Sequence, residues 1–343
     1  MYRKLREKLV VVMFLLFAVC MVCSVDSQAA KKKSKVTWKI KKGTLTVYGK
    51  GKMPLILIKK KEMRKVKKVV IKKGITTISR SAFEDMKNLK TAKIPSTVKS
   101  IGDKSFAGTA IKKLKVPSSV KKIGGHAFTS SRLRKLILPG DFKYKTEYPD
   151  WGRVVVGEIL GNNNPPIVQF STKLNLENAS LFVAKGYVVS KKDSKYCSVD
   201  GCIYTKDRKS LIRVPLRKKK LVIAEGCTEF CLQSVFHGLA DGSDLAESCN
   251  VSEIEIPASV KTIESKKYRQ KYRNSGPAPD IKKITIRTKQ LDGRSLAVLA
   301  YDLEVDAKKL MEQLPEQIYY RDGKYYSKDG VWIKPYPNKG YYK

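Results

Sequence analysis

Side chains suited to acid–base catalysis or metal binding are scarce in this chain. Its 343 residues include 2 His and 7 Cys, and histidine is the residue on which both kinds of site most often depend. The sequence contains no Gly-x-Ser-x-Gly motif, no glycine-rich phosphate loop and no His-Glu-x-x-His motif. Its acidic residues are scattered, so no two carboxylates stand out as an acid and a base. We therefore expect no catalytic residue, no metal site and no cofactor, with a hydrolytic enzyme as a remote alternative.

Five cysteines follow the N-terminal apolar segment: Cys197, Cys202, Cys227, Cys231 and Cys249. Their odd number leaves at least one thiol unpaired or bonded to another chain. Cys197 and Cys202 flank an Asp-Gly turn diagonally, which is a poor geometry for a disulfide. The C-x4-C and C-x3-C spacings match no usual zinc pattern. We favour buried thiols, and one or two disulfides or a metal site remain alternatives.

Lysine is the side chain present in excess. The chain carries 71 Lys+Arg and 31 Asp+Glu, a formal net charge of +40, and residues 31–139 hold 32 basic and 4 acidic residues, a net charge of +28. Such a charge indicates an anionic partner or environment. Lysine lacks the planar fork of arginine, which favours loose electrostatic attachment over geometric recognition of phosphate. No nucleic-acid-binding module is recognisable, so we expect no sequence-specific nucleic-acid partner.

A 22-residue repeat determines where these lysines lie. Leu89–Phe106 and Ile111–Phe128 match at this offset. Further copies begin at Val66, Leu133, Val251 and Ile281. Apolar residues at positions 4 and 6 predict a short strand with one buried face, which a proline at position 7 ends in most copies. Apolar positions 10 and 13 indicate a turn or short helical return. Because one copy cannot bury its own apolar face, we predict a stacked solenoid.

Positions 3 and 5 flank the buried position 4 and therefore point away from the core. The candidate ligand-binding residues at these positions are Lys68, Lys93, Lys113, Lys115 and Lys135. With strands about 4.8 Å apart, they would form columns of like charge that an anionic ligand or counterions must offset. Glu253 and Glu255 hold the same positions in the Val251 copy, which predicts a surface that changes sign along the solenoid. The alternative is a solvated lysine-rich surface that only keeps the protein soluble.

The Ile-Pro-Ser-x-Val-x-x-Ile-Gly-x-x-x-Phe run of two copies, and the similar Ile256–Ile263 segment, resemble the BspA-like class of bacterial leucine-rich repeat proteins. Cys197–Tyr204 with Leu211–Pro215 is similar to a hairpin that interrupts such arrays, and Val36–Pro54 resembles the family's N-terminal hairpin cap. The resemblance, over residues 36–288, implies a leucine-rich-repeat solenoid with short parallel strands on one face and turns or helical returns on the other. It also implies an exported or surface-displayed binding module, since several members are taken to be adhesins, but it supplies no ligand.

The N-terminus has the three parts of a secretory signal peptide. A basic start is followed by the apolar run Leu9–Cys23 and by a small-residue exit at Ala29. The run is short for a membrane-spanning helix, which needs about 20 apolar residues. We expect cleavage after residue 29 and no membrane span thereafter. An uncleaved anchor or a lipoprotein is the alternative.

The C-terminus predicts a helix and an aromatic hairpin. Asp306 is placed to N-cap a helix that runs to Leu314, and two Asp-Gly turns then lie between aromatic pairs, which is typical of a hairpin. The aromatic residues are Tyr319, Tyr320, Tyr325, Tyr326 and Trp332. They resemble, weakly, the hairpin repeats that bind cell-wall choline or glucans. The alternative is a cap whose rings cover the last open layer of the solenoid.

These patterns divide the chain into a signal peptide (1–29), a basic lead-in and N-terminal cap (30–65), regular leucine-rich repeats (66–139), an irregular region (140–196), a hairpin insertion with a second repeat array (197–288), and a C-terminal cap with an aromatic tail (289–343). We expect a secreted or cell-surface-associated, non-enzymatic binding or adhesion module. Its partner would be an anionic glycan, a wall polymer or a cell-surface protein, contacted through the exposed strand face. The alternative is an envelope-associated structural protein held non-covalently by charge.

Overall fold

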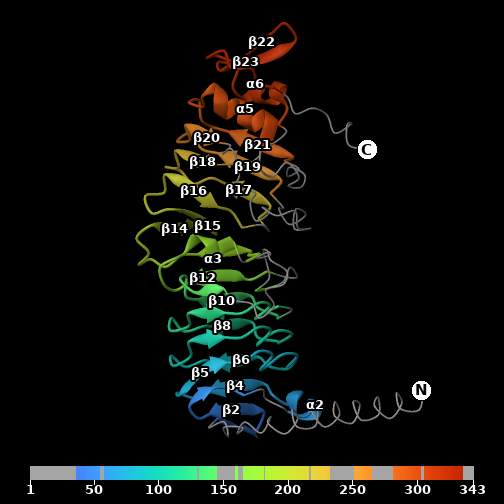
Figure 1. Ribbon diagram of the computed structural model, residues 1–343. Helices are drawn as coiled ribbons and strands as arrows, with labels where there is room; N and C mark the ends of the chain where they lie inside the picture. Colours follow the sequence, from blue (N-terminus) through green and yellow to red (C-terminus); the bar gives the residue numbers. More distant parts are fainter. Residues whose placement is uncertain are drawn as a thin grey trace, which may run out of the picture.

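The computed structural model describes residues 36–54, 58–129, 131–144, 159–160, 165–180, 182–215, 218–231, 251–264, 281–302 and 305–334. These residues wind into an elongated solenoid with a hairpin at each end (Figure 1). The expected signal peptide and Cys249 lie outside the described residues.

The first strand of each copy lies on one face of the solenoid, which we call the first face. At its N-terminal end β1 (Thr37–Lys41) and β2 (Thr44–Tyr48) form an antiparallel hairpin. β2 continues in parallel with β4 (Lys68–Ile71), and β4 pairs with β6 (Thr91–Lys93). A second group in the order β8, β10, β12 and β13 spans Lys113–Lys115, Lys135–Leu138, Ile167–Phe170 and Gly186–Val188. The N-terminal hairpin cap and the short parallel strands expected from the sequence are confirmed.

A second ladder of parallel strands lies where the sequence indicated a turn or helical return. Its strands, in sheet order, are β3 (Gly51–Lys52), β5 (Ile75–Ile78), β7 (Ser100–Ile101), β9 (Lys122–Ile123) and β11 (Lys143–Tyr144). In the Leu89 copy the Val98 N–H donates to the Pro95 carbonyl, which closes a turn, and Ile101 then lies in the strand. The spacing of three between positions 10 and 13 therefore spans a turn end and a strand: the turn that the sequence indicated is present, and a short strand rather than a helical return follows it.

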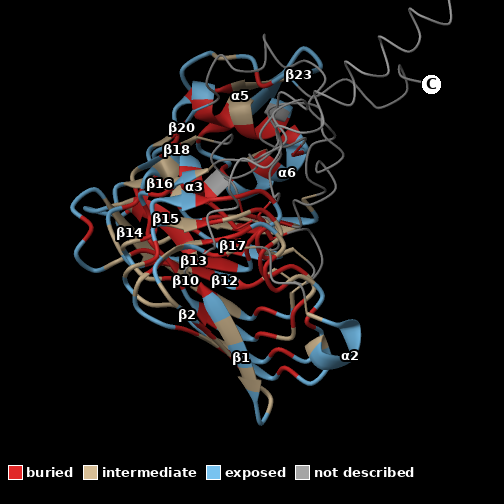
Figure 2. Ribbon diagram, turned by 60° about the horizontal axis from the view of Figure 1, so that its bottom comes forward, coloured by how far each residue is buried: buried red, intermediate tan, exposed pale blue. Residues whose placement is uncertain are grey.

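Turns form the remaining side of each coil and stack aromatic rings inside it. Phe83, Phe106 and Phe128, at position 18 of consecutive copies, are fully buried. Their ring centroids are 5.1 and 6.0 Å apart. Figure 2 shows buried residues along the inside of the coil and exposed residues along its outer edges. Two residues before each ring the backbone is left-handed, as at Lys104 (φ 53°) and His126 (φ 54°), and His126 is a surface residue of this turn.

A three-stranded antiparallel unit interrupts the array. β14 (Tyr196–Val199), β15 (Cys202–Thr205) and β16 (Ser210–Arg213) pair in sequence around the expected Asp-Gly turn. Its strands contribute to both of the hydrophobic clusters into which the buried residues divide: one extends from Val36 to Ile203 and the other from Cys202 to Ile333. Because Cys202 and Ile203 are consecutive in a strand, their side chains point to opposite faces, and β15 joins the two clusters.

The repeats resume after this interruption with the same two ladders. β16 leads into β18 (Glu229–Cys231) and β20 (Thr262–Glu264), while β17 (Lys220–Val222), β19 (Glu253–Ile256) and β21 (Lys283–Ile286) form the first-face ladder. Two short helices, α2 (Lys60–Met63) and α3 (Leu176–Ser180), lie in the first part of the chain.

Helices rather than aromatic rings close the C-terminal end. In α5 (Gly293–Asp302) the Ser295 hydroxyl accepts from the Ile263 N–H of β20 at 2.8 Å. The expected cap of α6 (Ala307–Gln313) is confirmed, since the Asp306 carboxylate accepts from the Lys308 N–H. The hairpin of β22 (Ile318–Arg321) and β23 (Lys324–Ser327) follows and adds the buried Ile318 to the core.

Removing the central ring of the aromatic column is expected to destabilise the first array. Phe106→Ala leaves a cavity between two stacked rings and should lower the free energy of unfolding by about 3–5 kcal/mol. Urea unfolding followed by circular dichroism measures this change. The exposed Lys87→Ala should change the stability by less than about 0.5 kcal/mol, and an equally small change for Phe106→Ala would contradict the role of the column.

Acid should weaken the buried hydrogen bonds that the Asp193 carboxylate accepts. The buried Asp193 carboxylate accepts from the N–H groups of Leu174, Lys195 and Tyr196. Burial raises its pKa, but these three hydrogen bonds outweigh that effect and hold the pKa below 3.8. Its contribution to stability is therefore present above the unfolded-state pKa, about 3.9, and is lost as the pH falls through the folded-state pKa.

Asp193→Asn should accordingly lower the free energy of unfolding at pH 7 by about 1–3 kcal/mol, and the difference from wild type should shrink below pH 4. Urea titrations at pH 7 and pH 3 test this, with the exposed Asp322→Asn as the control. A constant difference across the pH range would show that the carboxylate does not carry the effect.

Candidate functional site

The five lysines expected to form columns lie on the first face, but only two of them are neighbours in a hydrogen-bonded ladder. Lys68, Lys93, Lys113 and Lys115 are exposed and Lys135 is half-buried. Lys113 lies in register with Lys135. In contrast, Lys68 lies in register with Thr91, and Lys93 with Val70. Neutral residues therefore interrupt the two lysine columns: Thr91 at position 3, and Val70 and Ile137 at position 5.

The continuous basic column lies one residue earlier, at position 2. Here four consecutive copies carry a basic, exposed residue: Lys67, Lys90, Lys112 and Arg134. The Lys90 N–H donates to the Lys67 carbonyl at 2.9 Å, and the Arg134 N–H to the Lys112 carbonyl at 2.8 Å, which places each of these two pairs in register. No such bond joins Lys112 to Lys90 among the described residues. The repeat alignment contained this signal, but position 2 precedes the predicted strand and was not considered as part of its face.

Positions 2 and 3 together form a surface that we call the basic edge. It consists of Lys67, Lys68, Lys90, Lys112, Lys113, Arg134 and Lys135. Among the described residues none of these seven forms an ion pair with an acidic side chain. Within the described part of the chain, an approaching polyanion would therefore displace no carboxylate from these side chains.

The second array is built differently. Glu253 lies in register between Lys220 and Lys283, and the Glu255 carboxylate pairs with the Lys220 ammonium at 3.6 Å and with the Arg287 guanidinium. The change of sign predicted from Glu253 and Glu255 does not extend over the neighbouring turns, where Lys220 and Lys283 flank Glu253. Charges of opposite sign alternate there, which neutralises the acidic side chains within the protein.

A shorter basic column occupies the second ladder. Lys99, Lys121 and Lys143, at position 11, are linked by the N–H of each residue donating to the carbonyl of the preceding one, both at 2.8 Å. Here Lys121 pairs with Asp141 at 2.6 Å. Partial burial raises the Asp141 pKa, and the Lys121 and Thr172 hydrogen bonds bring it below 3.8, so this carboxylate is charged at neutral pH.

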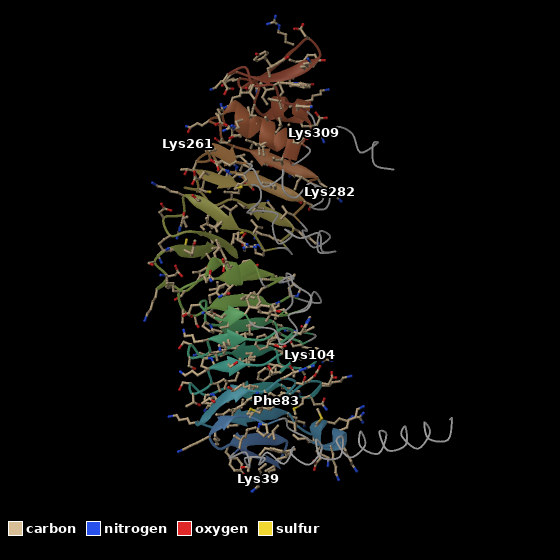
Figure 3. The ribbon with its side chains drawn as sticks, in the orientation of Figure 1. Lys39, Phe83, Lys104, Lys261, Lys282 and Lys309 are labelled. Atoms are coloured by element: carbon tan, nitrogen blue, oxygen red, sulfur yellow. The ribbon has the colours of Figure 1, made fainter. Side chains whose placement is uncertain are left out.

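The two basic columns face different sides. Figure 3 labels Lys261 and Lys282, which occupy positions 11 and 2 of later copies, and they project from opposite sides of the ribbon. Equivalent positions of successive copies lie in register, so positions 2 and 11 of the first array also lie on different sides. The basic edge and the position-11 column therefore do not form one continuous surface.

The C-terminal hairpin carries an exposed aromatic surface as well as a packing surface. Tyr319 and Tyr326 stack at 5.7 Å, and Trp332 bridges to Tyr326 as a third extended segment. The ammonium groups of Lys324 and Lys334 lie 5.1 and 5.5 Å from the centre of the Trp332 ring. We call Tyr319, Tyr326 and Trp332 the aromatic face.

The opposite side of the hairpin packs inward only in part, because Tyr320 is 58% exposed. Tyr320 and Tyr325 pair at 4.8 Å, and Tyr325 contacts the hydrophobic core. The five aromatic residues identified in the sequence are therefore brought together on one hairpin, but they are divided between its two faces.

The described cysteines provide no reactive site. Cys197, Cys202 and Cys227 are free thiols, which agrees with the buried-thiol interpretation for Cys202 and Cys227. Burial raises the pKa of Cys202 to about 12, so its thiol stays protonated at neutral pH. In the described part of the chain, no three His, Cys, Asp or Glu side chains gather in a way that could hold a metal ion. None of the helices found there is long and apolar enough to cross a membrane.

Residues 61–148 match the family described as the BspA type leucine-rich repeat region, in 6 copies. The resemblance seen in the repeat motif is confirmed, and the fold is a leucine-rich-repeat solenoid. No curated protein matches the chain.

Three of the solved structures to which the chain is similar are the following. A leucine-rich repeat protein from Eubacterium ventriosum has a TM-score of 0.38 at 17% identity, with 76% of this chain and 72% of that chain covered. For the pneumococcal vaccine antigen PcpA the TM-score is 0.34 at 15% identity, with 76% and 70% covered. For a leucine rich cell surface protein from Faecalibacterium prausnitzii it is 0.31 at 16% identity, with 78% of each chain covered.

Proposed function

We propose that this protein is an exported, non-enzymatic binding module that attaches through its basic edge to a polymer with repeated anionic groups. The observation that carries the proposal is the basic edge itself: seven basic side chains on four consecutive turns, without an acidic partner among the described residues. The BspA-type repeats at residues 61–148 support a binding rather than a catalytic role.

The geometry of the edge favours a polymer over a single small anion. Successive turns lie about 4.8 Å apart, and two positive charges at that distance repel by about 1 kcal/mol in water. A chain of phosphate, sulfate or carboxylate groups along the edge would relieve this repulsion at every turn and release bound counterions. Lysine side chains are flexible enough to follow a polymer whose charge spacing differs from that of the turns.

Two sources supply such a polymer: an anionic wall polymer of the producing cell, and an acidic glycan on another cell. The N-terminal segment supports a place outside the cell, where both occur. A salt wash of intact producing cells separates the two, because retention by charge on the cell's own wall requires release at moderate salt.

Charge removal from the edge is the direct test. In Lys67→Gln/Lys90→Gln/Lys112→Gln the position-2 column loses three charges, and the slope of log Kd against log salt should fall by about 2–3. Binding to a poly(glycerol phosphate) and to heparin, measured by calorimetry at several salt concentrations, gives the slopes and distinguishes phosphate from sulfated-sugar polymers.

The matched control is Lys191→Gln/Lys192→Gln/Lys195→Gln, which removes the same charge from exposed residues outside the edge. This variant should retain most of the wild-type slope. Equal losses for both triple variants would show that only the net charge matters, and the edge would then have no specific role.

The aromatic face of the C-terminal hairpin favours a second binding role, because the exposed rings of Tyr319 and Trp332 lie on either side of the half-buried Tyr326 in neighbouring extended segments. Such rings bind sugars or organic cations by stacking and cation–π contact. Tyr326→Ala/Trp332→Ala should lower binding to purified cell-wall glycan by about tenfold, with the thermal stability of the first array unchanged. Undiminished pull-down with wall glycan would leave the hairpin as a cap only.

A further inference from the structure

The first-face ladder is broken between β6 and β8. The strands form two separate four-stranded sheets, β1-β2-β4-β6 and β13-β12-β10-β8, although β6 and β8 belong to consecutive copies. The same two coils remain hydrogen-bonded elsewhere: the Lys121 N–H donates to the Lys99 carbonyl on the second ladder, and the Phe106 N–H to the Ala127 carbonyl in the turns, both at 2.8 Å. The two coils are therefore stacked in register, and it is on the first face that their strands are not hydrogen-bonded to each other.

The inward-facing residues of β6 agree with an opening at this place. Ala92 and Ile94 are half-buried, whereas Val69 and Leu114, which hold the position of Ala92 in the adjacent copies, are buried. Alanine is the smallest residue at this position in the first array, so β6 contributes the smallest side chain to the core at position 4.

The break leaves two consecutive backbone N–H groups without the acceptor that their equivalents share in other layers. In five other layers a single carbonyl oxygen of the preceding turn receives the N–H groups of positions 2 and 3 together. The Lys112 carbonyl accepts from Arg134 at 2.8 Å and from Lys135 at 3.1 Å, and the Gly43 carbonyl accepts from Lys67 at 2.8 Å and from Lys68 at 3.2 Å. At the break, the Lys112 and Lys113 N–H groups have no such acceptor among the described residues.

Convergent backbone N–H groups without a protein acceptor form a place where an oxygen atom is stabilised, and an anionic oxygen most strongly. The pair lies in the middle of the basic edge, with the exposed Lys90, Lys112 and Lys113 side chains around it. Lys93 and Lys115, the outward residues of β6 and β8, add two further charges on either side of the break.

We propose that the Lys112 and Lys113 amides form an anion subsite, in which one phosphate, sulfate or carboxylate oxygen of the bound polymer takes the place that the preceding carbonyl holds in the other layers. This rests on the proposed function and deepens it: the side chains of the basic edge attract the polymer, and the amide pair fixes one of its anionic groups at a defined turn.

Hydrogen exchange of the full-length secreted protein, followed by NMR with inorganic polyphosphate as the probe, tests the subsite. In the free protein the Lys112 and Lys113 amides should exchange at least about tenfold faster than the equivalent Arg134 and Lys135 amides. Saturating polyphosphate should slow both by at least about tenfold. Fast exchange that persists at saturation, or protection already equal to that of Arg134 and Lys135 in the free protein, would overturn the proposal.

A pair of variants separates the amide from the charge. Lys113→Gln removes the ammonium alone, and Lys113→Pro removes the ammonium and the N–H at the first residue of a strand, where proline is tolerated. The proline variant should bind polyphosphate about tenfold more weakly than the glutamine variant. Equal affinities would exclude a role for the Lys113 amide, and if the proline variant does not fold, the exchange measurement decides alone.

The outcomes distinguish the two proposals. Polyphosphate that binds the wild type with a slope dependent on the basic edge, but without protection of the amide pair, refutes the subsite and leaves the proposed function standing. Failure of the wild type to bind polyphosphate, poly(glycerol phosphate) and heparin at low salt refutes both.

Discussion

The hydrogen bonds between successive turns are the constraint on which the rest of this structure depends. Each backbone N–H that donates to the carbonyl 22 or 23 residues earlier, as Lys90 does to Lys67, places a residue directly beside its equivalent in the next copy. A residue type that recurs at one repeat position therefore becomes a column in space. Buried phenylalanines become a ring stack by this rule, and exposed lysines become the basic edge.

The two kinds of column act on stability in opposite directions. A buried ring contributes several kcal/mol through its packing, whereas neighbouring exposed lysines cost about 1 kcal/mol or less each, since water and salt screen them. The packing of the core therefore outweighs the repulsion within the basic edge, and the basic edge itself does not stabilise the fold. In the second array the same positions alternate Lys220, Glu253 and Lys283, which shows that the scaffold accepts a neutral pattern equally well. The charge on the first array is thus separable from the fold, which is what a binding surface requires.

The sequence predicts those features that follow from one position within the repeat. Alternation at positions 4 and 6 predicts the first-face strands and their buried residues, and the aromatic residue at position 18 predicts a core contact. The second ladder was missed because positions 10 and 13 belong to a turn end and a strand, so their spacing imitates a helical return. Position 2 was missed because it precedes the strand, although the register carries it onto the same edge. Helix α5 was missed as well: Asp292 accepts from the Ser295 N–H at its start, but no repeat pattern marks this segment.

The break between β6 and β8 is a feature of a different kind, because no single repeat position encodes it. It depends on how one copy with a small inward residue, Ala92, fits against the next copy, and so on packing between coils. The solenoid tolerates this opening since the second ladder and the turns still join the same two coils. A repeat protein built on three sides can thus release the backbone groups of one side locally while the other two preserve the register. Backbone N–H groups that elsewhere only hold the stack together then become available to a ligand at one turn, where the lysine columns already concentrate anions.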